Sequence, residues 1–304
     1  MSEIILRKNA KKLARRKALV AYSFILPNFI GFICLTLLPI LFSFVLSVCE
    51  WDAGNSSSIT FVGLKNFSKM AKDKTFHISL QNTLLYSIGV IPIALFLALF
   101  LALLMNSKIK GRVFFRSVNF FPYVASLVAI GVVWNALFHP ENGPVNQFLI
   151  SLGVQNPPRW AASTTWAMPT LILLSIWKNV GYYMVVYLAA LQGVPRELYE
   201  AAKIDGANAF QRFRKVTWPM LTPTTFFVCI MLTIYTFKVF DLMYITTQGG
   251  PGRSTNVLVY HIYNQAFISL DFGYASALSM VLFAIVLVIT LIQFRTEKKF
   301  SDYL

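Results

Sequence analysis

The sequence predicts an all-α protein that crosses a membrane six times, and three observations support this fold class. Hydrophobic residues make up 57% of the 304-residue chain, whereas charged residues make up only 13%, about half their share in soluble domains. Six apolar runs are each long enough to cross a bilayer. The net charge of +15 comes mainly from short segments between these runs, so membrane topology explains it better than a nucleic-acid partner does.

The first segment, residues 1–17, is a basic tail, and residues 18–48 form the first apolar run. A cleaved signal peptide is the alternative interpretation. However, the run is far longer than the roughly 7–15 apolar residues of a signal, and no small-residue cleavage site closes it. We therefore expect a first span that tilts or protrudes, with Pro27 and Pro39 as the places for kinks.

Five further spans are expected after the first. They cover residues 82–104, 117–138, 166–191, 224–246 and 272–294. The membrane domain therefore extends over 18–294, and 295–304 form a short tail. Six spans place both termini on one side, and the segments on that side carry nineteen basic residues against six on the opposite side. By the positive-inside rule we expect both termini to be cytoplasmic.

Three longer segments are expected on the outer side, at 50–79, 139–165 and 247–271. The third opens with Gly-Gly-Pro-Gly at 249–252, for which a turn is the expected structure. Its residues 255–267 have a helical pattern.

The basic segment 194–219 lies between the fourth and fifth spans and is expected to form two short helices with a break. Gly206 suits the end of the first helix, because glycine adopts the left-handed conformation of a C-cap without a Cβ clash. Asn208 can cap the start of the second helix. Pro219 and Pro223 are expected to end this segment and to start the fifth span.

The same segment resembles the E-A-A loop in the permease subunit of binding-protein-dependent ABC importers. The resemblance rests on Glu-Ala-Ala at 200–202, Asp-Gly-Ala at 205–207, Phe213, Val216 and the terminal Pro219. The stretches at 61–67, 121–126, 140–146 and 240–251 are similar to the carbohydrate branch of these permeases. The resemblance implies the type I importer permease fold, with a coupling contact to the ATPase made by Glu200, Ala201, Ala202, Asp205, Gly206 and Ala207.

The resemblance also implies partners and a location. We expect a second homologous permease, two ATPase subunits and an extracytoplasmic solute-binding protein that delivers a sugar, and no nucleic acid. We expect ATP and Mg²⁺ on the ATPase subunits and no cofactor on this chain. The expected location is the cytoplasmic membrane of a bacterium or archaeon.

The residues themselves argue against an enzyme. The phosphate-binding pattern G-x-x-x-x-G-K-[ST] of an ATPase is missing, and the dipeptide Gly-Lys does not occur. No Ser/His/Asp set or carboxylate pair faces a common cavity on this interpretation, so no catalytic residue is expected. The three cysteines and three histidines are scattered without ligand spacing, so no metal site is expected either.

Polar residues inside the expected spans are candidates for the substrate path, because ionisable groups in a membrane usually face a bundle interior or water. The candidates are Lys178, Asn179, Tyr182, Tyr183, Tyr235, Lys238 and Asp241. Lys238 and Asp241 lie three residues apart and are expected on one helix face. The alternative is that they neutralise each other or extend outward to the membrane surface, since both lie in the outer part of the span. Membrane-interface belts and helix packing are the alternative role for the tyrosines.

Two other function classes stay open. A secondary transporter or channel working alone could use Lys238 and Asp241 as a proton relay, although no internal repeat typical of such transporters is visible. A membrane-embedded enzyme would need a reactive cluster that the sequence lacks. An uncoupler distinguishes the first alternative, because it stops a secondary transporter and spares an ATP-driven importer.

Overall fold

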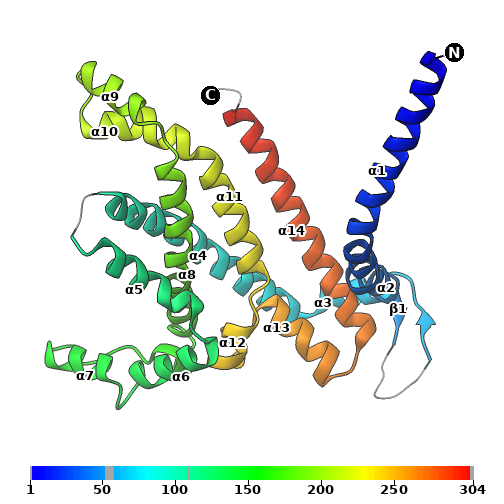
Figure 1. Cartoon of the computed structure of the whole chain (residues 1–304). Helices are drawn as coiled ribbons and strands as arrows, with labels where there is room; N and C mark the ends of the chain where they lie inside the picture. Colours follow the sequence, from blue (N-terminus) through cyan, green and yellow to red (C-terminus); the bar gives the residue numbers. More distant parts are fainter. Residues whose placement is uncertain (1, 52–57, 108–109, 302–304) are drawn as a thin grey trace.

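The computed structural model describes residues 2–51, 58–107 and 110–301, which are almost entirely helical (Figure 1). Five helical runs in this part are long and apolar enough to cross a membrane. They are Arg15–Ser47, Lys74–Asn106, Ala167–Gln192, Ala209–Phe237 and Phe272–Thr296. A sixth span is present if one bent pair of helices is counted as a single span. The predicted all-α membrane fold is therefore confirmed.

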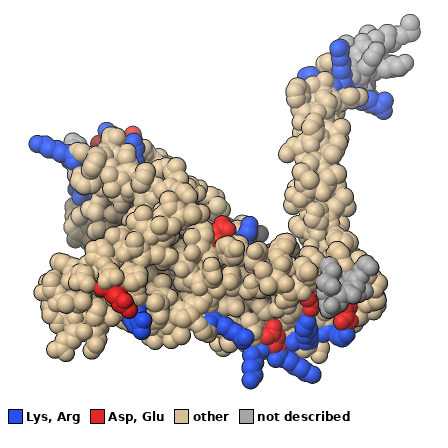
Figure 2. Space-filling view, turned by 90° about the horizontal axis from the view of Figure 1, so that it is seen from below, with Lys and Arg blue, Asp and Glu red and all other residues tan. Residues whose placement is uncertain are grey.

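The first span is helical throughout but contains one widened turn. Helix α1 (Ser2–Phe32) continues through a π-helical turn (Ile33–Leu37) into α2 (Leu38–Ser47). From Leu13 to Phe32 the large apolar side chains of α1 are exposed, and the helix stands apart from the other helices (Figures 1 and 2).

Two prolines follow π-helical turns in the same way. The amide of Leu38 bonds to the carbonyl of Ile33 just before Pro39, and the amide of Trp218 bonds to the carbonyl of Phe213 just before Pro219. A proline removes one amide and crowds the preceding turn, and a wider turn relieves that crowding.

The expectation that Pro219 and Pro223 separate the segment 194–219 from the fifth span is wrong, because a π-helical turn accommodates Pro219 within a continuous helix. Helix α10 (Ala209–Arg212) runs through the π turn Phe213–Thr217 directly into α11 (Trp218–Phe237). The second short helix of the segment 194–219 is thus the beginning of the fifth span.

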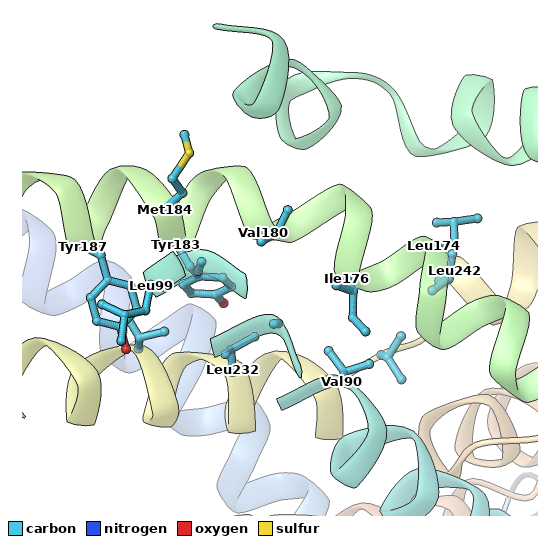
Figure 3. Packing of buried hydrophobic residues seen from close by; sticks show 14 of the residues in the cluster. Val90, Leu99, Leu174, Ile176, Val180, Tyr183, Met184, Tyr187, Leu232 and Leu242 are labelled. Atoms are coloured by element: carbon cyan, nitrogen blue, oxygen red, sulfur yellow. The ribbon is translucent and has the colours of Figure 1, made fainter. Parts of the chain in front are cut away.

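The core is built on the packing of α4 (Lys74–Asn106) against α8 (Ala167–Gln192). Val90, Ala94, Ala98 and Ala102 recur every four residues on α4 and are fully buried. Small residues at this spacing let two helices approach closely, which is how helices associate inside membranes. Figure 3 shows side chains of α4, α8 and α11 meeting in this core.

The third span is not the continuous helix expected over 117–138. It consists of α5 (Arg112–Val124) and α6 (Leu127–Leu137), which meet at an angle of 101°. Ala125 and Ser126 between them have extended backbone conformations. A proline at 122 weakens the last turn of α5, and contacts with α8 described below hold the break.

The fifth span is also interrupted, so the expectation that Lys238 and Asp241 share one helix face is wrong. Helix α11 ends at Phe237, and α12 (Asp241–Thr246) begins after three residues. Val239 at the break is buried. Phe240 packs on the rings of Tyr244 and Tyr263, at centroid distances of 5.3 and 4.9 Å. The packing of Val239 and Phe240 stabilises the break more than the hydrogen bonds of a continuous helix would stabilise the helix.

The outer segments contain short elements. They are β1 (Cys49–Glu50), β2 (Thr60–Phe61), α3 (Lys65–Lys72), α7 (Pro144–Ser151), a 3-10 turn (Trp160–Ala162), α13 (Leu258–Tyr263) and a π turn (Asn264–Ile268) before α14 (Phe272–Ser301). The strands β1 and β2 pair antiparallel. The predicted turn at 249–252 is confirmed, with φ of +77° at Gly249 and +55° at Gly252, and so is the helix expected within 255–267.

Basic side chains on the outer face lie next to acidic ones (Figure 2). Lys65 pairs with Glu50 and Lys69 with Asp271, each at 2.7 Å. The first pair lies within the first outer segment, and the second pair joins that segment to the third.

Candidate substrate cavity and coupling loop

All seven residues predicted for the substrate path line one cavity of about 520 Å³. Helix α8 contributes four of them, and the end of α11 and the start of α12 contribute three. The break in the third span forms another wall, with Tyr123 before the bend and Leu127 after it. The two interrupted spans therefore meet at this cavity. The residues that the structure brings together here are Lys178, Asn179, Tyr182, Tyr183, Tyr235, Lys238 and Asp241.

Two buried polar side chains in the cavity wall have hydrogen-bonding capacity to spare. Tyr183 is only 4% exposed, and its hydroxyl has no hydrogen-bond partner in the described part of the chain. Asn179 is 3% exposed, and its amide nitrogen donates to the Ser175 carbonyl (2.8 Å) and the Tyr235 hydroxyl (3.0 Å). The amide oxygen of Asn179 accepts no hydrogen bond from the described residues. Neither atom is among the enclosed polar atoms that lack a partner, so both face the cavity and are available to a ligand.

Aromatic rings line the same cavity. Tyr182 stacks on Tyr123 with ring centroids 4.6 Å apart and planes inclined by 18°. Tyr183 meets Tyr182 edge-on at 5.1 Å. Such surfaces present flat apolar faces beside polar hydroxyl groups, a combination that suits a ring bearing several hydroxyl groups.

The three charged residues of the cavity differ in their contacts. Lys178 donates hydrogen bonds to three backbone carbonyls of the third span. Lys238 and Asp241 are exposed to the cavity, and neither has an ion-pair partner within the described residues. The opposite charges of Lys238 and Asp241 offset each other without an ion pair among the described residues, so the positive charge of Lys178 remains on the wall.

The segment 194–219 forms the predicted helix, break and second helix on the side opposite the outer segments (Figure 1). Helix α9 (Arg196–Ile204) ends in a Schellman motif. The Ala207 amide bonds to the Ala202 carbonyl (2.9 Å), the Gly206 amide bonds to the Lys203 carbonyl (3.0 Å), and Gly206 has a φ of +76°. Asn208 then caps α10 in a reciprocal capping box with Gln211.

The two short helices enclose a groove of about 380 Å³. Its walls include Ala201, Ala202, Asp205 and Ala207 of the predicted coupling set, whereas Glu200 and Gly206 lie outside it. The Tyr199 hydroxyl lies 2.9 Å from the Thr217 hydroxyl, which ties α9 to the base of the fifth span. A displacement of α9 would therefore reach that span directly.

Two large apolar side chains beside the groove were missed as candidate contact residues. Ile204 is 87% exposed at the end of α9, and Phe210 is 70% exposed on α10. Ile204 lies outside the candidate membrane spans, and Phe210 lies at the start of the span Ala209–Phe237. From an amphipathic pattern, large apolar residues are expected on the buried face of a helix. The structure shows instead that Ile204 and Phe210 face outward.

A hydrogen-bonded cluster joins the outer ends of three segments. Asp73 accepts from the Tyr274 hydroxyl (2.8 Å) and the Thr75 amide (2.7 Å), and His261 Nε2 lies 3.1 Å from the same carboxylate. Burial alone would raise the pKa of Asp73, but these hydrogen bonds and His261 together lower it. Burial lowers the pKa of His261, against the opposing effect of Asp73.

The described ranges show no candidate metal site. No group of three or more His, Cys, Asp or Glu residues there could hold a metal ion. The three cysteines are unpaired, and they lie far apart in the sequence at 34, 49 and 229.

Comparisons with known proteins agree with this architecture. Residues 91–302 match the family described as "Binding-protein-dependent transport system inner membrane component". The probable ABC transporter permease protein YesP of Bacillus subtilis (strain 168) is 37% identical over 293 residues, which cover 95% of this chain and 94% of that protein. The lactose transport system permease protein LacF of Rhizobium radiobacter is 37% identical over 268 residues, covering 86% and 89%.

A third relative and a solved structure extend the comparison. The sn-glycerol-3-phosphate transport system permease protein UgpA of Agrobacterium fabrum is 34% identical over 258 residues, covering 84% of this chain and 87% of that protein. The fold is similar to a chain in the crystal structure of a bacterial ABC transporter involved in the import of the acidic polysaccharide alginate, with a TM-score of 0.82, 22% identity, and coverage of 93% and 96%. The chain therefore belongs to the family of inner membrane components of binding-protein-dependent transport systems, the permease subunits of ABC transporters.

Proposed function

We propose that this permease subunit carries a carbohydrate through the cavity between α8, α11 and the bent third span, in an importer driven by ATP. The observation that carries the proposal is the convergence of seven residues from separate helices on one cavity, where polar atoms of two of them face the cavity without a protein partner in the described part of the chain. Its volume of about 520 Å³ falls within the roughly 300–1,000 Å³ of small-molecule sites. Relatives named for lactose and for glycerol 3-phosphate favour a sugar or a related polyol as substrate.

The chemistry of the wall supports this substrate class. A sugar hydroxyl could donate to the Asn179 amide oxygen and accept from the Tyr183 hydroxyl, so both buried groups would gain the partners they lack. Each such hydrogen bond would contribute about 0.5–1.5 kcal/mol to binding. The Tyr123–Tyr182 stack would contact the apolar face of the sugar ring.

The coupling function would belong to Glu200, Ala201, Ala202, Asp205, Gly206 and Ala207. We infer that α9 docks on a separate ATPase subunit, which would hold the ATP and Mg²⁺ that this chain has no motif to bind. The hydrogen bond between the Tyr199 and Thr217 hydroxyls would pass the movement of α9 to the fifth span. The small side chains of Ala201 and Ala202 leave room for a protein surface to approach.

The remaining subunits follow from the same proposal. A second permease would complete the path, two ATPase subunits would drive it, and an extracytoplasmic binding protein would deliver the sugar. A solved relative of this fold is described in complex with an alginate pentasaccharide-bound periplasmic protein, which supports this last partner. The basic residues around α9 and in the terminal tails support cytoplasmic termini in a bacterial or archaeal membrane.

The test is uptake by the assembled importer. The chain is coexpressed with its partner subunits, reconstituted in liposomes, and supplied with binding protein and radiolabelled lactose or glycerol 3-phosphate. ATP supplied on the ATPase side should drive uptake of at least one of these probes, and an uncoupler should leave that uptake unchanged. Uptake by this chain alone, without ATP and abolished by the uncoupler, would contradict the proposal and identify a secondary transporter.

A further inference from the structure

The bend in the third span exposes backbone carbonyls within a membrane-spanning segment. Helix α5 ends at Val124, and Ala125 and Ser126 leave the helical conformation. The last carbonyls of a helix have no partner within the helix. Lipid offers no hydrogen-bond donors, so each such carbonyl must find a partner in the protein or in the water of a cavity, or cost several kcal/mol.

One side chain supplies these partners. The Lys178 Nζ donates to the carbonyl oxygens of Pro122 (3.1 Å), Tyr123 (3.1 Å) and Ala125 (3.2 Å). An ammonium group has three N–H donors, so these three carbonyls use its full capacity. The positive charge also lies at the carbonyl end of α5, where the helix dipole favours a cation.

Two further residues on the same face of α8 contact the bend. Lys178, Gly181 and Tyr182 are spaced i, i+3 and i+4, which places them together on a helix surface. At Gly181 the backbone of α5 comes so close that an added Cβ would clash with the Asn119 carbonyl oxygen. Tyr182 stacks on Tyr123 at the end of α5.

We propose that Lys178 is a positioning residue that holds the third span at its bend, rather than a group that binds the substrate. It fixes the end of α5 on α8 and thereby sets the cavity wall made by Tyr123 and Leu127. The consequence for transport rests on the proposed function, whereas the role in the bend does not.

A distance measurement tests the role in the bend. Ketone-bearing amino acids are encoded at Val113 on α5 and Val133 on α6, both exposed, and are spin-labelled without touching the native cysteines. The labelled importer is studied in nanodiscs by pulsed electron paramagnetic resonance. A straight helix would separate these positions by about 30 Å along its axis, and the 101° bend shortens the separation.

We expect one narrow distance in the wild type and a longer, broader distribution in Lys178→Met, because methionine leaves three carbonyls unpaired. Lys238→Met is the matched control, since it removes the other cavity lysine, and it should keep the wild-type distance. Lys178→Gln keeps two N–H donors on a shorter side chain, so it decides the question if Lys178→Met fails to insert. It should broaden the distribution.

Unchanged distances in the Lys178 variants would overturn the proposal. A second readout is uptake of a neutral and an anionic sugar. Lys178→Met should reduce both by the same factor. Selective loss of anionic uptake with an unchanged distance would assign Lys178 to the substrate instead. Because the distances are measured without transport, a failure of the proposed function would leave this result standing.

Discussion

Replacing Gly206 with valine should weaken the contact between α9 and the ATPase while the membrane helices still form. Gly206 has a φ of +76°, and nothing lies within 4 Å of an added Cβ. The cost therefore comes from the backbone and not from a clash. A left-handed conformation costs a residue with a Cβ about 1–2 kcal/mol. If the loop relaxes to avoid that strain, docking must restore the turn, and the apparent dissociation constant rises by about 5- to 30-fold.

The assay is retention of the ATPase subunit by the purified importer, together with its ATP-driven uptake. Gly206→Asn is the matched control, because asparagine tolerates the left-handed conformation, and it should behave nearly as the wild type. Ala202→Asp should also weaken retention, since it places a charge beside Asp205 in the groove. Membrane levels should be normal in each variant, because α9 lies outside the candidate spans. Wild-type retention and uptake in Gly206→Val and Ala202→Asp would refute the coupling assignment.

Two further predictions concern the isolated chain and the outer cluster. The purified chain alone should hydrolyse no ATP, and steady turnover by a contamination-free preparation would contradict this. The fold lowers the pKa of His261, so below about pH 6.5 this side chain binds a proton more readily in the unfolded state. The contribution of His261 to the free energy of unfolding is therefore complete above about pH 6.5 and decreases as the pH falls below that value. The melting temperature in nanodiscs should therefore decrease on acidification, and His261→Gln should flatten that decrease; equal slopes in both proteins would exclude His261 as the cause.

Local structure around α9 could be predicted from sequence because local residues determine it. Gly206 and Asn208 occupy the C-terminal and N-terminal caps that their chemistry favours. Both act on backbone groups within a few residues, so no knowledge of the fold was needed. The long apolar runs predicted the spans for the same reason.

The breaks in the third and fifth spans could not be predicted in this way. Pro122 is the only local signal at the bend, whereas the group that stabilises it, Lys178, lies 56 residues away. The fifth span contains no Gly or Pro after Pro223, and its break depends on the packing of Phe240 against Tyr263 from another segment. Tertiary contacts override helical continuity at both places.

The residues that line the cavity could be chosen from the sequence, but their contacts could not. Every polar residue chosen from the spans lines the cavity, because a bilayer leaves such residues few other places. Their roles differ in ways that residue type does not reveal. Lys178 is fully occupied by carbonyls, whereas Tyr183 has a hydroxyl without a partner in the described ranges.

The most direct test of the central claim compares two tyrosines on α8. Tyr183 lines the cavity, and Tyr187, one turn further on, is fully buried and does not. In ATP-driven uptake, Tyr183→Phe should raise the KM for the transported sugar by about 2- to 10-fold, the value of one hydrogen bond of roughly 0.5–1.5 kcal/mol. Tyr187→Phe should leave KM unchanged. Equal KM values in the wild type and both variants, at normal membrane levels, would contradict the claim that the sugar passes through this cavity.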